Sequence, residues 1–488
     1  MQDPNTLLQQ ALALHQSGNV EQAAALYRQL ARRFPRNAQL LHLLGTAESQ
    51  RGNRLEGIRL LEESIRIAPD NSEAHNNRAI VLTELNRFDE ALQSFEQATR
   101  IDPENVGAHL GLADTLHSLS RYDDAVRSYE RAVQLAPSNA FAHYSMGFNL
   151  QLLGRYREAM HSYELATRYK PDLGEAHWNR SLLKLLTGDF AEGWRLYEWR
   201  WQAASSRKFR RDFPHPLWLG QESIAGRTIL VHAEAGLGDS IQFCRYLPMV
   251  ERLGARIVLE IQSALVTLVS TLRCDFVVVH GGQEIPQFDV QCPMMSLPLA
   301  FGTELDTIPA EVPYLHVDPD RQRRWRERLG AKTSPRVGLV WSGSEEHGND
   351  RNRSIGLETL RPLFDLPIEF HSLQKEYRQA DRELLGRLPQ IRDHHRELED
   401  LSDTAALIGE LDLVISVDTS VAHLAGALGG KVWVLLPFVP DFRWLLDRSD
   451  SPWYPTATLF RQRRAGDWDG VIREVRGELL GLQPSVAS

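Results

Sequence analysis

Cysteine is scarce in this 488-residue sequence. Cys244, Cys274 and Cys292 are an odd number, lie far apart and include no C-x-x-C pair. A disulfide framework and a zinc ribbon are therefore excluded, and the composition is typical of a reducing compartment. The sequence also shows no signal-peptide pattern and no apolar run long enough to cross a membrane. We expect a cytoplasmic protein without a transmembrane segment.

Positive charge is in short supply as well. Lysine and arginine number 55 against 64 acidic residues, which gives a formal net charge of −9. This balance argues against a nucleic-acid partner and against a polybasic membrane anchor. Any phosphate site must then be built locally. The length suits about three domains at roughly 150 residues per domain, and a hydrophobic content of 42% is ample for their cores.

Several common catalytic motifs are missing. The chain has no G-x-x-x-x-G-K-[ST], no H-E-x-x-H and no G-x-S-x-G, so a P-loop nucleotide hydrolase is not expected. Two D-x-D triplets, Asp318/Asp320 and Asp467/Asp469, are the residues that a metal-bound nucleotide sugar would need. Each precedes a predicted helix, where carboxylates act as caps. We interpret both as structural and expect no metal or other cofactor.

A 34-residue period runs through the first 200 residues. It is carried by columns of prolines, small residues and mostly aromatic residues. These are Pro35, Pro69, Pro103, Pro137 and Pro171; Ala11, Gly45, Ala79, Ala113, Gly147 and Ser181; and Tyr27, Leu61, Phe95, Tyr129, Tyr163 and Tyr197. Small residues let two helices approach closely, and Gly18, Gly52, Gly154 and Gly188 are expected to end the first helix of a unit. The pattern resembles the tetratricopeptide repeat, with six repeats over residues 4–203.

Such an array carries no chemistry of its own. Stacked helix pairs form a superhelix whose concave face commonly holds an extended peptide or protein. We expect a protein partner, the alternative being a rigid spacer. The aromatic residues Trp194, Tyr197, Trp199 and Trp201 end the array. They are interpreted as core where the array docks onto its neighbour, with a binding platform as the alternative.

From residue 214 onward, apolar runs of strand length alternate with helical segments. The predicted strands are 228–233, 256–261, 275–280, 336–341, 367–372, 411–417 and 431–436, and the predicted helices include 240–253, 319–330, 378–388, 419–428 and 468–481. This alternation predicts parallel sheets covered on both faces. The proline-dotted stretch 309–319 divides the region into two doubly wound domains, 214–316 and 317–488. In such folds ligands bind at the carboxyl ends of the strands.

Two of four candidate sites combine a strand end with a helix start. In the first, Gly236 and Gly238 form a tight loop and Asp239 opens a helix. From spacing alone, Asp239 is equally a helix cap or a base. In the second, Asp418, Thr419 and Ser420 begin a helix whose free N–H groups suit a diphosphate, unless this is an ordinary capped helix. His423, on the same helix, faces either the ligand or the core.

The other two candidate sites are polar segments that directly follow predicted strands. The loop that opens with Trp341 and Ser342 carries Arg351 and Arg353, and a guanidinium there could bridge phosphate oxygens, although most surface arginines do not. Gln374 and Lys375 follow strand 367–372 and are the weakest candidates for contact with a ribose or phosphate.

The segments GLGDSIQ, NDRNRSI and SVDTSVAHLAGALG, in this order, resemble bacterial heptosyltransferase-like glycosyltransferases of the GT-B fold. The whole chain resembles bacterial proteins that fuse tetratricopeptide repeats to such a domain. The resemblance implies two Rossmann-like domains facing a crevice, 214–316 on the acceptor side and 317–488 binding the nucleotide sugar. It also implies inverting, metal-independent transfer, with Asp239 as the general base and the Asp418 loop on the donor diphosphate. Heptosyltransferases usually place lysine where this chain has Arg353 or Arg351.

The function implied by this resemblance is transfer of a sugar to serine or threonine hydroxyls of a protein that the repeats recruit, flagellin being one acceptor class. One alternative is a transferase for lipopolysaccharide or another glycan, and a further alternative is a non-catalytic adaptor. The sequence identifies neither the sugar, the nucleotide, the acceptor nor the oligomeric state.

Overall fold

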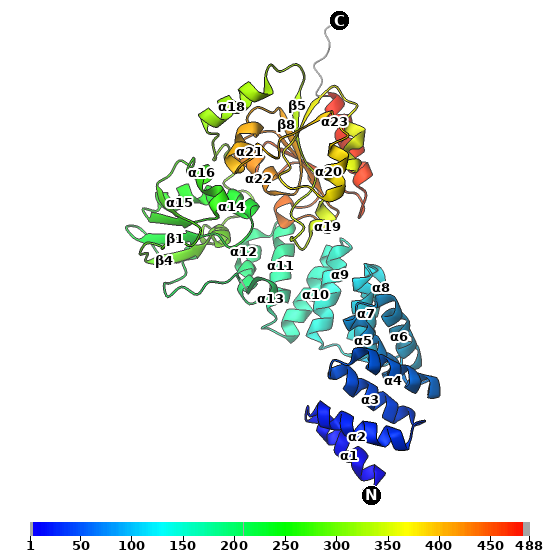
Figure 1. Ribbon diagram of the computed structural model, residues 1–488. Coiled ribbons are helices and arrows are strands. Elements are labelled where there is room, and N and C mark those ends of the chain that lie inside the picture. The colour runs from blue at the N-terminus through cyan, green and yellow to red at the C-terminus, as the bar shows by residue number, and fades with distance from the viewer. Residues whose placement is uncertain (1–2, 208, 482–488) are drawn as a thin grey trace. The chain divides into compact units, whose positions relative to one another are not determined.

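A computed structural model describes residues 3–207 and 209–481 (Figure 1). The chain divides into two compact units, Met1–Ala176 and His177–Ser488. The first unit is built from helices, and the second contains two parallel β-sheets with their covering helices. None of the described helices is long and apolar enough to cross a membrane. The last seven residues of the predicted domain 317–488 lie outside the described residues.

The first 200 residues form six helix pairs, as the period predicts. The first helices of the pairs are α1 (Pro4–Gln16), α3 (Ala38–Gln50), α5 (Ser72–Glu84), α7 (Val106–Ser118), α9 (Ala140–Leu152) and α11 (Gly174–Leu186). The second helices are α2 (Val20–Arg33), α4 (Arg54–Ile67), α6 (Phe88–Ile101), α8 (Tyr122–Leu135), α10 (Tyr156–Tyr169) and α12 (Phe190–Tyr197). Every start recurs at a step of 34 residues.

The ends of these helices have a local chemical cause. The four predicted turn glycines adopt positive φ angles, 81° at Gly18 and 91° at Gly52 for example, which end the first helix of a pair. Asn37, Asn71, Asn105 and Asn139 begin the first helices of the following pairs, where each side chain accepts a hydrogen bond from a backbone N–H three residues on.

The small and aromatic columns pack as the spacing requires. Ala11, Ala79 and Ala113 are completely buried, and so is the Tyr163 ring. A Cβ atom at Gly147 would lie 2.8 Å from that ring, so only glycine fits beneath it. The structure therefore confirms a tetratricopeptide-type helical array and gives the reason for its composition.

The second unit holds two separate parallel sheets. The four-stranded sheet has the order β3-β2-β1-β4, and the six-stranded sheet has the order β10-β9-β8-β5-β6-β7. Their strands are β1 (Thr228–His232), β2 (Arg256–Glu260), β3 (Phe276–Val279), β4 (Val290–Pro293), β5 (Arg336–Val340), β6 (Glu369–Ser372), β7 (Ile391–Asp393), β8 (Leu413–Val417), β9 (Val432–Leu436) and β10 (Ala457–Arg461).

The strand order locates the candidate site. Counted within the six-stranded sheet, the strands lie in the order 3-2-1-4-5-6, which is the order of doubly wound dinucleotide-binding folds. The order reverses between β5 and β8, and ligands of such sheets bind beyond the carboxyl ends at that point. The smaller sheet reverses in the same way between β1 and β4.

Helices connect these strands and cover the sheets. The α-helices are α13 (Ala204–Arg207), α14 (Leu237–Phe243), α15 (Leu247–Arg252), α16 (Val266–Val269), α17 (Leu297–Ala300), α18 (Pro319–Leu329), α19 (Asp350–Arg353), α20 (Gln379–Leu385), α21 (Leu401–Ile408), α22 (Ser420–Ala427) and α23 (Trp468–Gly481). The 3₁₀ turns are η1 (Glu198–Trp201), η2 (Cys244–Tyr246), η3 (Ser263–Leu265), η4 (Met294–Ser296), η5 (Leu357–Leu363) and η6 (Phe442–Trp444).

The sixth helix pair is part of the second compact unit. Trp194 of α12 is buried, and its ring meets the rings of Phe243 and Phe442 edge to face at 6.1 and 5.7 Å. Tyr197 is buried beside it. These two aromatic residues are therefore core, as the sequence favoured, and they tie α12 to the α/β region.

Candidate functional site

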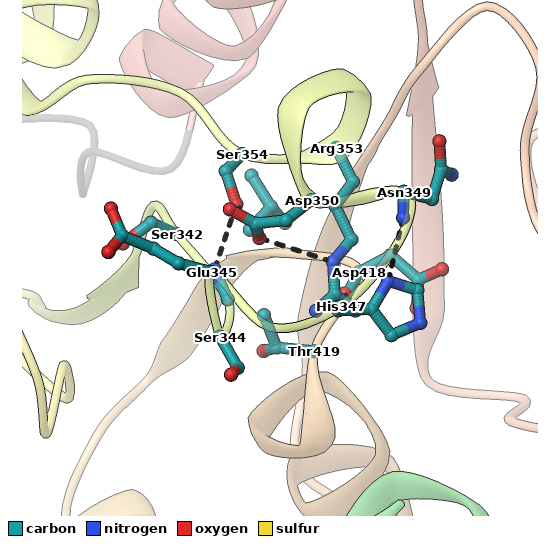
Figure 2. Close-up of polar contacts among 12 residues, drawn as sticks. Ser342, Ser344, Glu345, His347, Asn349, Asp350, Arg353, Ser354, Asp418 and Thr419 are labelled. Carbon is teal, nitrogen blue, oxygen red and sulfur yellow. Dashed lines mark hydrogen bonds and ion pairs between the residues drawn. The ribbon is translucent and has the colours of Figure 1, made fainter. Parts of the chain in front are cut away.

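Two loops meet at the carboxyl edge of the six-stranded sheet, where the strand order reverses. Arg353 ends α19, which lies in the loop after β5, and its Nη1 donates to the Asp418 carbonyl oxygen after β8 at 2.9 Å. Figure 2 shows this side chain reaching from α19 toward Asp418 and Thr419. Among the described residues the Arg353 Nε has no hydrogen-bond partner, although the Asp350 carboxylate lies 3.6 Å away. The buried Nε of Arg353 therefore has an ion-pair neighbour but no hydrogen bond within the described part of the chain.

The loop after β5 is held rigidly by its own polar side chains. The Ser354 hydroxyl donates to Asp350 at 2.6 Å and accepts from the Gly343 N–H at 2.9 Å. A Cβ atom at Gly343 would lie 2.4 Å from Arg353 Nη2, so the guanidinium rests directly on the glycine backbone. This close approach explains why a glycine stands there.

The loop after β8 carries a buried carboxyl group next to a helix start. Burial, reinforced by the negative charge of Asp441, raises the pKa of Asp418 to about 7. Thr419 is the N-cap of α22, and its hydroxyl lies 3.0 Å from that of Ser416. The first N–H groups of α22, from Ser420 onward, therefore start beside Arg353 and form a local set of donors for an anion.

His423 lies one turn into α22 and faces the smaller sheet's helix α14. Its Nδ1 lies 3.0 Å from the Tyr454 hydroxyl, and a Cβ atom at Gly238 would lie 2.9 Å from its ring. Burial, together with the nearby Arg443 guanidinium, lowers the pKa of His423 well below its ordinary value, so the imidazole is neutral. Helices α14 and α22 thus contact each other, and the carboxyl ends of β1 and β8 face the same place.

Asp239 has the cap role that the sequence left open, and it also pairs with an arginine; its role as a base remains a prediction. One carboxylate oxygen accepts from the Gly236 N–H at 2.8 Å, which caps α14. The other pairs with the guanidinium of Arg443, which follows β9. The preceding loop is itself fixed, because Gln262 donates to the Ala235 carbonyl at 2.8 Å. Asp239 is therefore both a helix cap and a member of the site.

Arg443 links the two halves of the site. Besides Asp239, its guanidinium donates to Asp441 at 2.8 Å and to the Gln242 side-chain oxygen at 2.6 Å. It also lies 4.5 Å from the centre of the Phe442 ring. Only 8% of its side chain is exposed. We call Asp239, Gln242, Asp441 and Arg443 the Arg443 cluster.

Several predicted site residues use their side chains for hydrogen bonds within the protein. Trp341 is completely buried, and its indole N–H donates to Asp381 at 3.0 Å. The Gln374 amide bonds the backbone of Trp341 and Ser342, so it shapes the loop. Lys375 donates to the carbonyl oxygens of residues 395 and 398. Their contact with a donor remains a prediction.

Of the two candidate arginines, Arg351 is exposed on α19, whereas Arg353 points to β8. Asp418, Thr419, Ser420 and His423 lie together with Arg353, and Gly236, Gly238 and Asp239 face them from α14.

The D-x-D triplets serve helix ends. Asp318 is the N-cap of α18 and accepts from the N–H groups of Asp320 and Arg321, each at 2.9 Å. Asp467 accepts from the Gly470 N–H at 3.1 Å at the start of α23. Both aspartates therefore cap helices, which is the structural role that the sequence favoured.

The sequence analysis did not single out Arg443, Asp441 or Gln242. The available signal was an aspartate and an arginine in the otherwise apolar stretch 435–445, directly after a predicted strand. In parallel sheets this is the edge where ligands bind.

Comparison with known proteins supports the repeat region. Four tetratricopeptide repeat models match residues 5–37, 36–104, 76–140 and 142–173. Protein FlbA of Caulobacter vibrioides is 26% identical over 316 residues, covering 59% of this chain and 52% of the relative. The chain therefore spans about half the length of the curated relative it matches. The matched 59% of the chain is longer than the 203 residues up to the end of the repeats. The match therefore includes part of the α/β region.

Solved structures resemble about a third of the chain. The crystal structure of MamA is 19% identical, covering 33% of this chain and 94% of its own, with a TM-score of 0.32. The structure titled "YrrB: a TPR protein with an unusual peptide-binding site" is 19% identical, covering 37% of this chain and 93% of its own, with a TM-score of 0.33. The family models show tetratricopeptide repeats over residues 5–173, and a parallel-sheet α/β region follows the helix pairs.

Proposed function

We propose that the α/β region is a GT-B glycosyltransferase that moves a sugar from a nucleotide-sugar donor to a protein hydroxyl. The observation that carries the proposal is the bond from Arg353, after β5, to the Asp418 carbonyl, after β8, at the reversal of a 3-2-1-4-5-6 sheet. This is the point where doubly wound sheets bind nucleotides. The motifs that resemble heptosyltransferases include both of these loops and the Asp239 loop.

The proposed reaction is a single displacement with inversion. The acceptor oxygen attacks the anomeric carbon, the bond from that carbon to the diphosphate oxygen breaks, and Asp239 takes the hydroxyl proton. A positioned base of this kind contributes roughly 10²–10⁴-fold. The leaving nucleoside diphosphate develops negative charge, which Arg353 and the first N–H groups of α22 can stabilise without a metal ion.

The proposed acceptor is a protein held by the repeats. Arrays of this type commonly bind extended peptides on their concave face. Serine and threonine hydroxyls are the nucleophiles in this proposal, and flagellin is an acceptor class among the fusion proteins that this chain resembles. A transferase for lipopolysaccharide would share the donor site but would not need a peptide-binding array.

The test has two parts. Titration with a panel of uridine, guanosine, thymidine and cytidine sugar nucleotides should find at least one ligand, because an adaptor without a donor site would bind none. With that donor, Asp239→Asn should lower sugar transfer by about 10²–10⁴-fold without loss of donor binding. Full activity of this variant would contradict the assignment of Asp239 as base.

A further inference from the structure

The Arg443 cluster joins elements that are far apart in the sequence. Asp239 and Gln242 lie on α14, whereas Asp441 and Arg443 lie in the segment after β9. The Arg443 guanidinium donates hydrogen bonds to three side chains, Asp239, Asp441 and Gln242. A buried arginine shared by two carboxylates is strongly held, and each oxygen of Asp239 accepts from one donor, Arg443 on one oxygen and the Gly236 N–H on the other.

This arrangement conflicts with the role of a base. A carboxylate that accepts a proton from a hydroxyl needs one oxygen within hydrogen-bond reach of that hydroxyl. In the structure one oxygen of Asp239 caps α14 and the other pairs with Arg443. An acceptor hydroxyl must therefore compete with Arg443 or with the Gly236 N–H for these oxygens, and exchange of the Arg443 pair would remove the charged competitor.

The surroundings favour an anion as the new partner of Arg443. The Gln242 side chain is completely buried, and its Nε2 has no hydrogen-bond partner among the residues that the structure describes. A buried donor without an acceptor is unfavourable, because it has lost its hydrogen bond to water. A phosphate oxygen beside Arg443 would satisfy this amide. The Arg353 Nε, from the β5 loop, is a second buried N–H without a hydrogen bond among the described residues, although Asp350 lies 3.6 Å away.

We propose that Arg443, which pairs with Asp239, is a phosphate-binding residue that exchanges this carboxylate for the donor diphosphate when a nucleotide sugar binds. The inference rests on the proposed function and adds an order of events to it. Donor binding releases the Asp239 oxygen from its charged competitor, so the base becomes more available when a sugar is in place. Guanidinium groups bind phosphate through paired N–H donors, and a diphosphate carries more charge than one carboxylate.

Asp239 and phosphate compete for Arg443 in this proposal. A variant that lacks the Asp239 carboxylate should therefore bind phosphate compounds more tightly. Binding of inorganic pyrophosphate and of the nucleoside diphosphates UDP and GDP is measured by calorimetry on the full chain. Asp239→Asn removes the competitor for Arg443 and should tighten binding by about three- to tenfold. Arg443→Gln should weaken binding at least tenfold, and Arg443→Lys should retain part of it. Arg323→Gln, on the exposed face of α18, is the matched control and should bind like the wild type.

The outcomes separate this inference from the proposed function. A gain of affinity in Asp239→Asn cannot arise from misfolding, so it supports the inference even if Arg443→Gln folds poorly. If the wild type binds a nucleoside diphosphate but Asp239→Asn binds it equally or more weakly, the exchange of Arg443 is wrong and the transferase proposal stands. If the wild type binds none of the three probes, this inference fails, whereas the proposed function is decided by the titration with sugar nucleotides.

Discussion

At the scale of single residues, the position of Arg353 depends on the absence of a side chain at Gly343. The guanidinium lies against the glycine backbone and donates to the Asp418 carbonyl. A long arginine side chain is flexible, and it loses considerable conformational entropy when it is held in one position. Defined contacts are therefore needed to hold its guanidinium in place. The glycine therefore provides the space in which Arg353 can meet the β8 loop.

Gly343→Ala should displace Arg353 without unfolding the domain, because the Cβ atom would collide with the end of a flexible side chain. We expect about tenfold weaker nucleoside diphosphate binding, which corresponds to roughly 1.4 kcal/mol or one charge-assisted hydrogen bond, and an unchanged melting temperature. Gly348→Ala in the same loop is the control, since nothing lies within 4 Å of its added Cβ. Equal affinities of the two variants would contradict this role of Gly343.

Asp418 leads to a prediction for the dependence of stability on pH. Its pKa of about 7 lies above the ordinary value of about 4, so between these values the folded protein holds a proton that the unfolded chain has released. Stability from this group is therefore lost as the pH rises from 4 to 7. Asparagine does not titrate, so the melting temperature of Asp418→Asn minus that of the wild type should increase between pH 5 and pH 7.5.

Thermal unfolding at constant ionic strength measures this difference. Asp469→Asn removes an exposed carboxylate and serves as the control. Parallel profiles for Asp418→Asn and the wild type would show that the Asp418 carboxyl is not perturbed by burial.

The sequence predicted part of the site for a clear physical reason. The Asp239, Arg353 and Asp418 loops follow predicted parallel strands, and the carboxyl ends of such strands lie on one edge. It did not predict Arg443, because the pair with Asp239 joins residues 204 positions apart. Nor did it predict that Gln374 and Lys375 bind backbone groups, since the paths of their loops depend on tertiary packing.

At the scale of elements, the turn within each helix pair follows one rule with two exceptions. Four of the six equivalent positions are glycines with positive φ, whereas Asn86 and Ser120 adopt φ angles of 57° and 59°. Asparagine tolerates this conformation better than serine, since its side chain can bond the local backbone. Ser120 is therefore the more strained of the two.

Ser120→Gly should stabilise the array, because glycine adopts positive φ without the steric cost of a Cβ atom. We expect a gain of about 0.5–1 kcal/mol and a higher melting temperature of the helical transition. Ser128→Gly, inside α8, is the matched control and should lower stability by a similar amount. Calorimetry of the full chain measures both, and a loss of stability in Ser120→Gly would contradict the strain argument.

The elements differ in how well the sequence predicted them. The positions of the repeats were predicted accurately, because a fixed period constrains the bounds of every helix together. The asparagine caps were not predicted. In the α/β region β4, β7 and β10 were missed, since they are three to five residues long and lie at or near the sheet edges. The predicted helix 240–253 is three short pieces, α14, η2 and α15, because Pro248 begins a new helical turn.

At the scale of the whole molecule, the sixth helix pair belongs with the α/β region. Arg200 of η1 is buried and donates to Glu234, in the loop after β1, at 3.0 Å and to Ser296 at 2.8 Å. Burial raises the pKa of Glu234 to about 7 against the opposing charge of Arg200. The predicted array ended at residue 203, whereas the compact units divide after Ala176. The last repeat is thus bonded to the loop that leads to Asp239.

This connection was not visible in the periodicity, because a repeat has the same spacing whether its outer face meets another repeat or a sheet. The overall charge of −9 was informative at this scale. It argues against a broad basic surface, and the proposed phosphate site consists of single arginines and one helix start, which is consistent with this deficit.

The most direct test of the account is mass spectrometry of proteins from host cells that make either the wild-type chain or Asp239→Asn. We expect at least one protein to carry a sugar mass on serine or threonine with the wild type and to lack it with the variant. Identical glycan masses on all proteins in both cells would contradict the claim that this chain is a protein glycosyltransferase with Asp239 as its base.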